Sequence, residues 1–155
     1  MSTKTVMTHS RIFPALVAAF FIMLISSPAR GQQPALLLFG DDDHKTFLGC
    51  LNCGRFETNS VCNRFGEYGS RFSEKSIWNR FGEFGSKVSD KSPWNKFATN
   101  PPVIVDGDGN SYGYFTSSRY HTSRTRNEFF LVFLDRPDDV NEDLQRASDL
   151  FCGRD

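Results

Sequence analysis

The sequence lacks an apolar stretch long enough to cross a membrane. The longest one runs from Ile12 to Ile25, short of the roughly 20 residues that a membrane-spanning helix needs. Basic residues precede this stretch, and the small residues Ala29 and Gly31 follow it. This pattern is typical of a secretory signal peptide over residues 1–31, which leaves one domain over residues 32–155. Cleavage after Ala29 and an uncleaved amphipathic anchor are the alternatives.

A basic surplus is also missing. The chain has 18 basic and 18 acidic side chains, and loss of residues 1–31 would remove Lys4, Arg11 and Arg30, leaving 15 against 18. The exported part would therefore carry a formal charge of −3. Because nucleic-acid binding needs an excess of cations, we expect no nucleic-acid partner.

Recognisable catalytic motifs are absent as well. His44 and His121 are the histidines beyond residue 31, and neither has a serine, cysteine or aspartate companion in a known pattern. Gly66 to Gly69 are followed by neither a helix signal nor a Lys-Ser/Thr pair, so they are not a phosphate-binding loop. We expect a protein without a cofactor and favour a non-catalytic role over a metal-dependent hydrolase.

Cysteine is scarce, and all four cysteines lie beyond the expected cleavage site. An even number in a small exported domain predicts two disulfides, which we assign as Cys53–Cys62 and Cys50–Cys152. The close spacing of Cys50 and Cys53 also fits a redox pair. A zinc site formed by Cys50, Cys53, Cys62 and either His44 or Cys152 is another alternative.

What the sequence does contain is one short unit written almost three times. Cys62, Trp78 and Trp94 are spaced by 16 residues. The first two units read Cys62-Asn63-Arg64-Phe65-Gly66-Glu67-Tyr68-Gly69-Ser70 and Trp78-Asn79-Arg80-Phe81-Gly82-Glu83-Phe84-Gly85-Ser86, and the third is cut short at Trp94-Asn95-Lys96-Phe97.

These units are too rich in glycine for helix interiors, so we expect short strands or extended turns that stack on one another. The rings of Trp78, Trp94, Phe65 and Phe81 would form an internal ladder. Neighbouring residues of an extended chain point to opposite faces, which would put the adjacent cations outward. Asparagine recurs directly after the Cys/Trp position, and its hydrogen bonds to nearby backbone would explain this without a ligand.

The flanking sequence predicts an α+β fold. Ala35–Phe39 reads as a buried strand, and β-prone residues on both sides of residues 106–110 read as a hairpin. Residues 129–134 fit a buried strand or a buried helix equally well. Beyond Pro137 the apolar spacing predicts one C-terminal helix, with Asp139 and Glu142 as its capping box.

Two acidic segments are weak candidates for a hard cation. Asp106, Asp108 and Asn110 resemble the opening of a calcium loop, but Ser111 and Ser117 stand where that loop requires glycine and glutamate. We therefore interpret the segment as a turn. The three consecutive aspartates 41–43 are interpreted as a solvated loop, with a cation site as the alternative.

Residues 47–152 resemble a group of small exported bacterial proteins. The carrying motifs are Phe47-Leu48-Gly49-Cys50-Leu51-Asn52-Cys53 and the Ser-Ile-Trp-Asn type of repeat, together with Pro102-Val103-Ile104-Val105-Asp106 and Leu150-Phe151-Cys152. The resemblance implies export and a tandem repeat, and it assigns no catalytic residue.

The functional hypothesis is a binding or envelope-associated module, in the periplasm or secreted. The partner would be a cell-envelope polymer, such as a cell-wall glycan, or another envelope protein, and a self-associating structural protein is the alternative. Sugar rings stack on aromatic faces, and arginine binds acidic groups with two hydrogen bonds. The candidate binding residues are Trp78, Trp94, Arg64, Arg80, Asn79 and Asn95.

Overall fold

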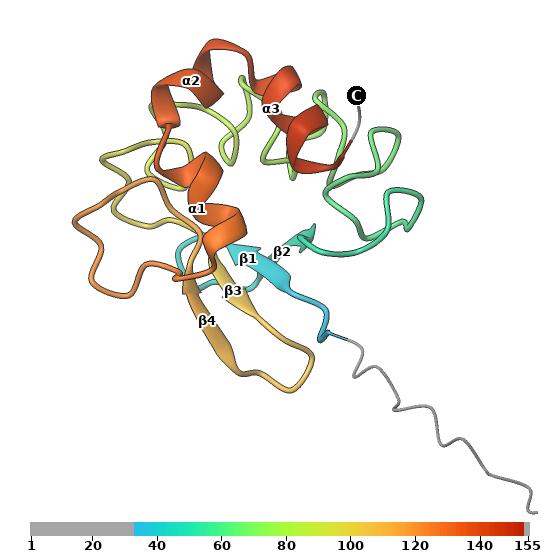
Figure 1. The fold of residues 1–155 in the computed structure, drawn as a ribbon, viewed down its shortest axis with the longest axis horizontal. Helices are drawn as coiled ribbons and strands as arrows, with labels where there is room; N and C mark the ends of the chain where they lie inside the picture. The colour runs from blue at the N-terminus through green and yellow to red at the C-terminus, as the bar shows by residue number, and fades with distance from the viewer. Residues whose placement is uncertain (1–32, 154–155) are drawn as a thin grey trace, which may run out of the picture. The chain divides into compact units, whose positions relative to one another are not determined.

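The computed structural model describes residues 33–153 and shows four short strands in one antiparallel sheet (Figure 1). The strands are β1 (Leu37–Gly40), β2 (Thr46–Cys50), β3 (Val103–Val105) and β4 (Ser111–Tyr114). Their order is β2-β1-β3-β4, so β1 pairs both with the strand that follows it and with β3 from beyond the glycine-rich units. The predicted signal peptide lies outside the described residues.

Both strand predictions are confirmed. The apolar run before Gly40 forms β1, in which Leu38 is fully buried. β3 and β4 form the predicted hairpin, and its turn is organised by the carboxylate of Asp106. That carboxylate accepts hydrogen bonds from the backbone of Asp108 and Asn110 and from the hydroxyl of Tyr112.

Residues 51–102, which we call the turn region, join β2 to β3 as a series of reverse turns. Backbone hydrogen bonds close a turn about every third residue, as from Asn79 N to Ser76 O and from Gly82 N to Asn79 O. The side chain that opens a turn accepts the backbone N–H two residues on, as Ser76 does from Trp78. Serine and asparagine at three-residue spacing therefore specify turns, and the strands that were the alternative do not form.

The asparagines and glycines of the units hold successive turns together. Asn79 donates from Nδ2 to the carbonyl of Ser73 at 3.1 Å and accepts from the backbone N–H of Phe81 at 3.1 Å. Asn63 and Asn95 make the same pair of bonds at their own positions. A Cβ on Gly85 would overlap the backbone of Asn79, so this close approach requires glycine.

The two tryptophans fill the inside of the turn region. Trp94 is fully buried and Trp78 is 2% exposed, and their rings stack with centroids 5.3 Å apart. Each indole N–H donates to a carbonyl one unit back, Trp78 to Val61 at 2.8 Å and Trp94 to Ile77 at 2.6 Å. The predicted internal ladder is therefore correct for the tryptophans.

The ladder prediction is wrong for the phenylalanines. Phe65 is 93% exposed and Phe81 is 91% exposed. The strand rule that placed these rings inward does not apply, because the two central residues of a reverse turn project from the same corner. Ile77 and Trp78 both point inward, whereas Arg80 and Phe81, at the centre of the next turn, are both exposed.

Three helices follow the sheet: α1 (Glu128–Leu134), α2 (Pro137–Glu142) and α3 (Leu144–Phe151). Residues 129–134 are thus helical. The single predicted C-terminal helix is wrong, because the chain breaks at Asp143, whose carboxylate caps α3 by accepting from Arg146 N. The predicted capping box of Asp139 and Glu142 does not form, since α2 begins with Pro137 and has no side-chain cap.

The helices close the core over the tryptophans. In Figure 1, α2 and α3 lie over the loops of the turn region. Phe151 of α3 contacts the ring of Trp78 at 5.4 Å, and Asn141 of α2 donates to the backbone carbonyl of Trp94 at 3.0 Å. Phe115, after β4, packs against Trp94 from another side at 5.6 Å.

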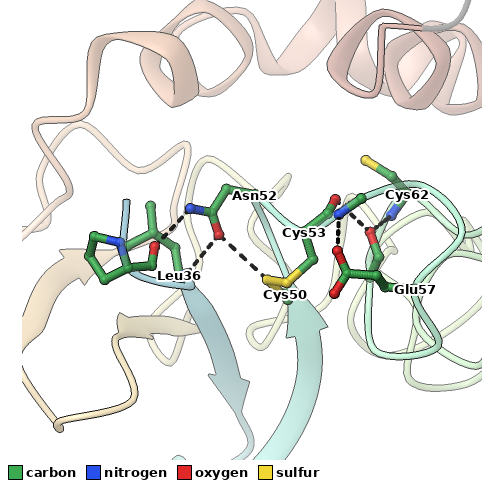
Figure 2. The surroundings of a disulfide bond; sticks show 9 residues. Leu36, Cys50, Asn52, Cys53, Glu57 and Cys62 are labelled. Carbon is green, nitrogen blue, oxygen red and sulfur yellow. Dashed lines mark hydrogen bonds between the residues drawn. A yellow bond between two sulfur atoms is a disulfide. The ribbon is translucent and has the colours of Figure 1, made fainter. Parts of the chain in front are cut away.

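All four cysteines form disulfides, but the predicted pairing is wrong. Cys50 bonds to Cys53, and Cys62 bonds to Cys152. The local bond closes the tight loop after β2, where Asn52 accepts from Leu36 N and donates to the carbonyl of Pro34 (Figure 2). With every cysteine oxidised, the thiolates that the zinc alternative needs are absent, whereas Cys50 and Cys53 form the bond that a redox pair would also form.

The long-range disulfide, Cys62–Cys152, takes the place that a tryptophan ring has in the other units. Cys62 occupies the place in its unit that Trp78 and Trp94 occupy in theirs, and it is 6% exposed. Its bond ties the end of α3 to the first unit. Within residues 33–153, no helix combines the length and the apolar character needed to cross a membrane.

Candidate functional site

The most unusual surface of the domain is a set of exposed pairs, each a cation followed by an apolar residue. We call these pairs the tips. Five of the six apolar members are phenylalanine, and all six are at least 70% exposed. The tips are Arg55-Phe56, Arg64-Phe65, Arg71-Phe72, Arg80-Phe81, Lys87-Val88 and Lys96-Phe97.

The tips fall into two series with the spacing of the units. One series lies before the Cys/Trp position, at residues 56, 72 and 88, and the other lies after it, at residues 65, 81 and 97. The stacked tryptophans, 5.3 Å apart, indicate the distance between neighbouring units. A ligand along either series would therefore meet similar side chains at a regular, short interval.

Several tips keep the cation against its own ring. The guanidinium of Arg71 lies 4.7 Å from the centre of the Phe72 ring, and that of Arg55 lies 5.0 Å from the Phe56 ring. Arg80 is 5.9 Å from Phe81. Such a contact stabilises an exposed cation only modestly, but it leaves a flat face and N–H donors directed at solvent.

Each unit forms a cleft between its two tips. The first cleft, of about 350 Å³, is lined by Arg55-Phe56, Cys62 and Arg64-Phe65. The third, of about 610 Å³, is lined by Lys87-Val88, Trp94 and Lys96-Phe97, together with part of α2. Between them lies the central cleft, of about 990 Å³.

The central cleft has two walls of different origin. Arg71-Phe72, Trp78 and Arg80-Phe81 line it on the turn-region side. Residues 132–150 of the helical segment line the other side and include Arg136 and Arg146. It is the largest of the three clefts and falls at the upper end of the size range of ligand sites, about 300–1,000 Å³.

The structure separates the predicted binding residues into two groups. Arg64 and Arg80 are tip residues and line the clefts. Trp78 and Trp94 also line clefts, but both are buried, and both polar groups of the side chains of Asn79 and Asn95 are bonded within the chain. These four residues hold the turn region together.

Sequence reasoning missed the exposed phenylalanines. The available signal was the three-residue spacing of serine, asparagine and glycine, which distinguishes a series of turns from a strand. In turns, a cation beside an aromatic residue indicates that both side chains project outward.

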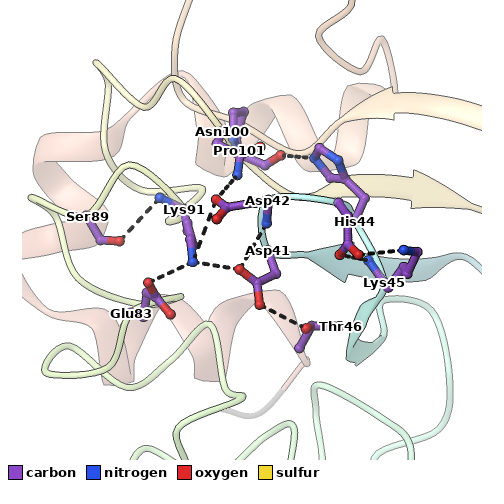
Figure 3. Close-up of polar contacts among 11 residues, drawn as sticks. Asp41, Asp42, His44, Lys45, Thr46, Glu83, Ser89, Lys91, Asn100 and Pro101 are labelled. Carbon is purple, nitrogen blue, oxygen red and sulfur yellow. Dashed lines mark hydrogen bonds and ion pairs between the residues drawn. The ribbon is translucent and has the colours of Figure 1, made fainter.

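The acidic loop of residues 41–43 contacts the turn region through an ammonium group. Lys91 Nζ lies 2.6 Å from Asp41 and 3.0 Å from Glu83, with Asp42 at 3.8 Å (Figure 3). Hydrogen bonds to Asp41 and Glu83 raise the pKa of Lys91, and the Lys91 ammonium lowers the pKa of Asp41. A lysine thus occupies the position where the cation alternative would place a metal.

Asp106, Asp108 and Asn110 lie together in the hairpin turn, as predicted. Hydrogen bonds lower the pKa of Asp106. The bond from the Asn110 side chain has the largest effect, followed by the bonds from the Asn110 backbone N–H and the hydroxyl of Tyr112. Among the described residues, no group of three or more histidine, cysteine, aspartate or glutamate side chains is placed to hold a metal ion.

The two histidines flank the same tyrosine. His44 lies 5.5 Å and His121 lies 4.2 Å from the ring of Tyr114. His44 also bonds the carbonyl of Pro101 through Nε2 at 3.1 Å. Both histidines therefore pack within the loops around β4.

Comparison of the chain with protein-family models, with curated proteins and with solved structures finds no match.

Proposed function

We propose that this chain is an exported, non-catalytic binding module whose stacked units hold an extended glycan of the cell envelope. The observation that carries the proposal is the two series of tips. Six exposed apolar side chains, each beside a cation, recur at the spacing of the units.

The stability of the fold does not explain why these apolar side chains are present. Phe65 and Phe81 are almost fully solvated, so they contribute little to the core. A single exposed apolar residue is ordinary on a protein surface, but a regular series of them marks a binding surface. All four cysteines form disulfides. Disulfides form and persist in oxidising compartments outside the cytoplasm, so these two bonds support export.

A glycan fits the tips better than other extended polymers. Sugar rings present apolar faces that stack on aromatic rings, and their hydroxyl groups bond to charged side chains. The stacked tryptophans, with ring centroids 5.3 Å apart, indicate a short and regular interval between units, and an extended glycan also presents its sugar rings at a short and regular interval. Nucleic acid would meet a domain with a formal charge of −3 over residues 32–155.

The test is co-sedimentation of the oxidised protein with insoluble envelope polysaccharide, including peptidoglycan. We expect the triple variant Phe65→Ser/Phe81→Ser/Phe97→Ser to reduce the bound fraction at least tenfold with an unchanged melting temperature. The matched control is Tyr120→Ser, which removes an 89% exposed ring outside the tips. Equal binding by the triple variant and the control would refute the proposal.

Self-association through the same tips is a second candidate, favoured by the exposure of at least 70% at every apolar tip residue. Sedimentation velocity separates the two functions. If the tips join copies of this chain, the wild-type protein will sediment as an oligomer and the triple variant as a monomer. A monomeric wild type that binds polysaccharide supports the first candidate.

A further inference from the structure

The central cleft contains cations that are not held in ion pairs within residues 33–153. Arg71, Arg80, Arg136 and Arg146 all line this cleft, two from the turn region and two from the helical segment. None of the four forms an ion pair with a described residue. A guanidinium that is not in an ion pair keeps its N–H donors available to bind a carboxylate with two parallel hydrogen bonds.

In the outer units, unlike the central unit, the cation after the Cys/Trp position forms an ion pair. Arg64 of the first unit pairs with Asp149 of α3 at 3.0 Å, and Lys96 of the third unit pairs with Asp138 of α2 at 3.1 Å. Arg80 occupies the equivalent place in the middle unit and has no such acid. The helices thus neutralise the outer cations of this series and leave the central one available.

Acidic groups also line the central cleft, and they restrict the ligand. Asp143 is engaged as the cap of α3, whereas Asp139 and Glu142 are exposed and form no ion pair with a described residue. Carboxylates accept hydrogen bonds from hydroxyl groups and repel anions. A polyanion without hydroxyl groups would therefore be disfavoured here.

The central cleft also has an apolar lining, which further restricts the ligand. The exposed rings of Phe72 and Phe81 stand at the mouth, and Val132 and Leu150 add half-exposed apolar surface from α1 and α3. The occupant must combine an apolar face, hydroxyl groups and a negative charge. A sugar that carries a carboxylate has all three.

We propose that the central cleft is the specificity site of the module and binds a carboxylated sugar residue of the glycan. Arg80 and Arg136, from opposite walls, would bind the carboxylate, and Phe72 and Phe81 would stack on the sugar ring. Asp139 and Glu142 would accept hydrogen bonds from its hydroxyl groups. The proposal rests on the glycan-binding function above and adds the class of sugar and the unit that selects it.

The experiment compares envelope polysaccharide in its native form with the same material after its carboxylates have been converted to neutral amides. We expect the protein to bind the native form at least tenfold more tightly. Arg80→Gln/Arg136→Gln should remove most of this preference while it retains weak binding to both forms. The control Lys45→Gln/Arg126→Gln removes the same charge outside the cleft and should keep the full preference.

The outcomes separate this inference from the function on which it rests. Equal binding of native and amidated polysaccharide would overturn the carboxylate site and leave glycan binding intact. Binding to neither form would overturn both. An inorganic polyphosphate probe tests the role of the acids: polyphosphate bound as tightly as the native glycan, and released by the same double substitution, would show that charge alone is selected.

Discussion

Trp78 and Phe81 occupy the same position in successive turns of one unit, yet they meet opposite surroundings. Each is the third residue of a turn opened by a side chain that accepts its N–H, Ser76 for the first and Asn79 for the second. Trp78 is 2% exposed, whereas Phe81 is 91% exposed. Local turn geometry therefore does not decide which ring enters the core.

The two rings differ in the contacts that are available to them. The indole N–H of Trp78 donates to a backbone carbonyl, and its ring stacks on a second indole and contacts the ring of Phe151. Phe81 has a charged neighbour, Arg80, at the same corner, and burying that corner would desolvate the guanidinium. One unit thus presents an inner ring for stability and an outer ring for contact with a ligand.

The most direct test of this comparison replaces one ring of each kind. Trp94→Ala should destabilise the fold by about 3–5 kcal/mol, because it opens a cavity and leaves the carbonyl of Ile77 without its donor. Phe97→Ala, three residues on, should change stability by about 0.5 kcal/mol or less. Urea unfolding followed by circular dichroism measures both variants, and similar losses would contradict the division into inner and outer rings.

The two disulfides should differ in the same measurement. Cys62–Cys152 spans 90 residues and fixes α3 over the turn region, so Cys62→Ser/Cys152→Ser should cost about 4–5 kcal/mol. Cys50–Cys53 spans 3 residues, and removal of its short loop should cost about 2 kcal/mol by the same entropy argument. A larger loss from the short bond would show that it, and not the long one, holds the helices in place.

Much of the fold could be predicted from local pattern. The α+β class, the hairpin around Asp106, the first strand and the inward tryptophans all follow from residue types at short spacing. The disulfide pairing could not, because it depends on where α3 ends relative to the first unit. The break at Asp143 was missed because apolar spacing continues across it from Val140 to Leu144.

The site was predicted only in part, for one physical reason. Arg64 and Arg80 were found because a charged residue is expected at the surface in a strand or a turn. Phe65 and Phe81 were missed because alternation assigns neighbours to opposite faces, and this rule holds for extended chains only. Arg136 and Arg146 lie far along the sequence, and only the packing of α2 and α3 brings them to the clefts.

The smallest expected effect concerns the contact between the acidic loop and the turn region. The pKa of Asp41 is lowered first by its hydrogen bond from Lys91, so ionised Asp41 stabilises the fold above its unfolded pKa of about 4. That contribution is lost as the pH falls through the lower pKa of the folded state. The melting temperature should therefore decline slightly further on acidification in wild type than in Lys91→Met.

Lys75→Met provides the matched control, since Lys75 pairs with Glu67 at 3.1 Å within the turn region and does not reach the acidic loop. The Lys91 pair joins residues 50 positions apart, whereas the Lys75 pair is local, so the loss of Lys91 alone should loosen the loop. Hydrogen exchange at residues 41–46 measures this. Exchange in Lys91→Met no faster than in Lys75→Met would show that the loop is held by β1–β2 pairing and not by the ammonium.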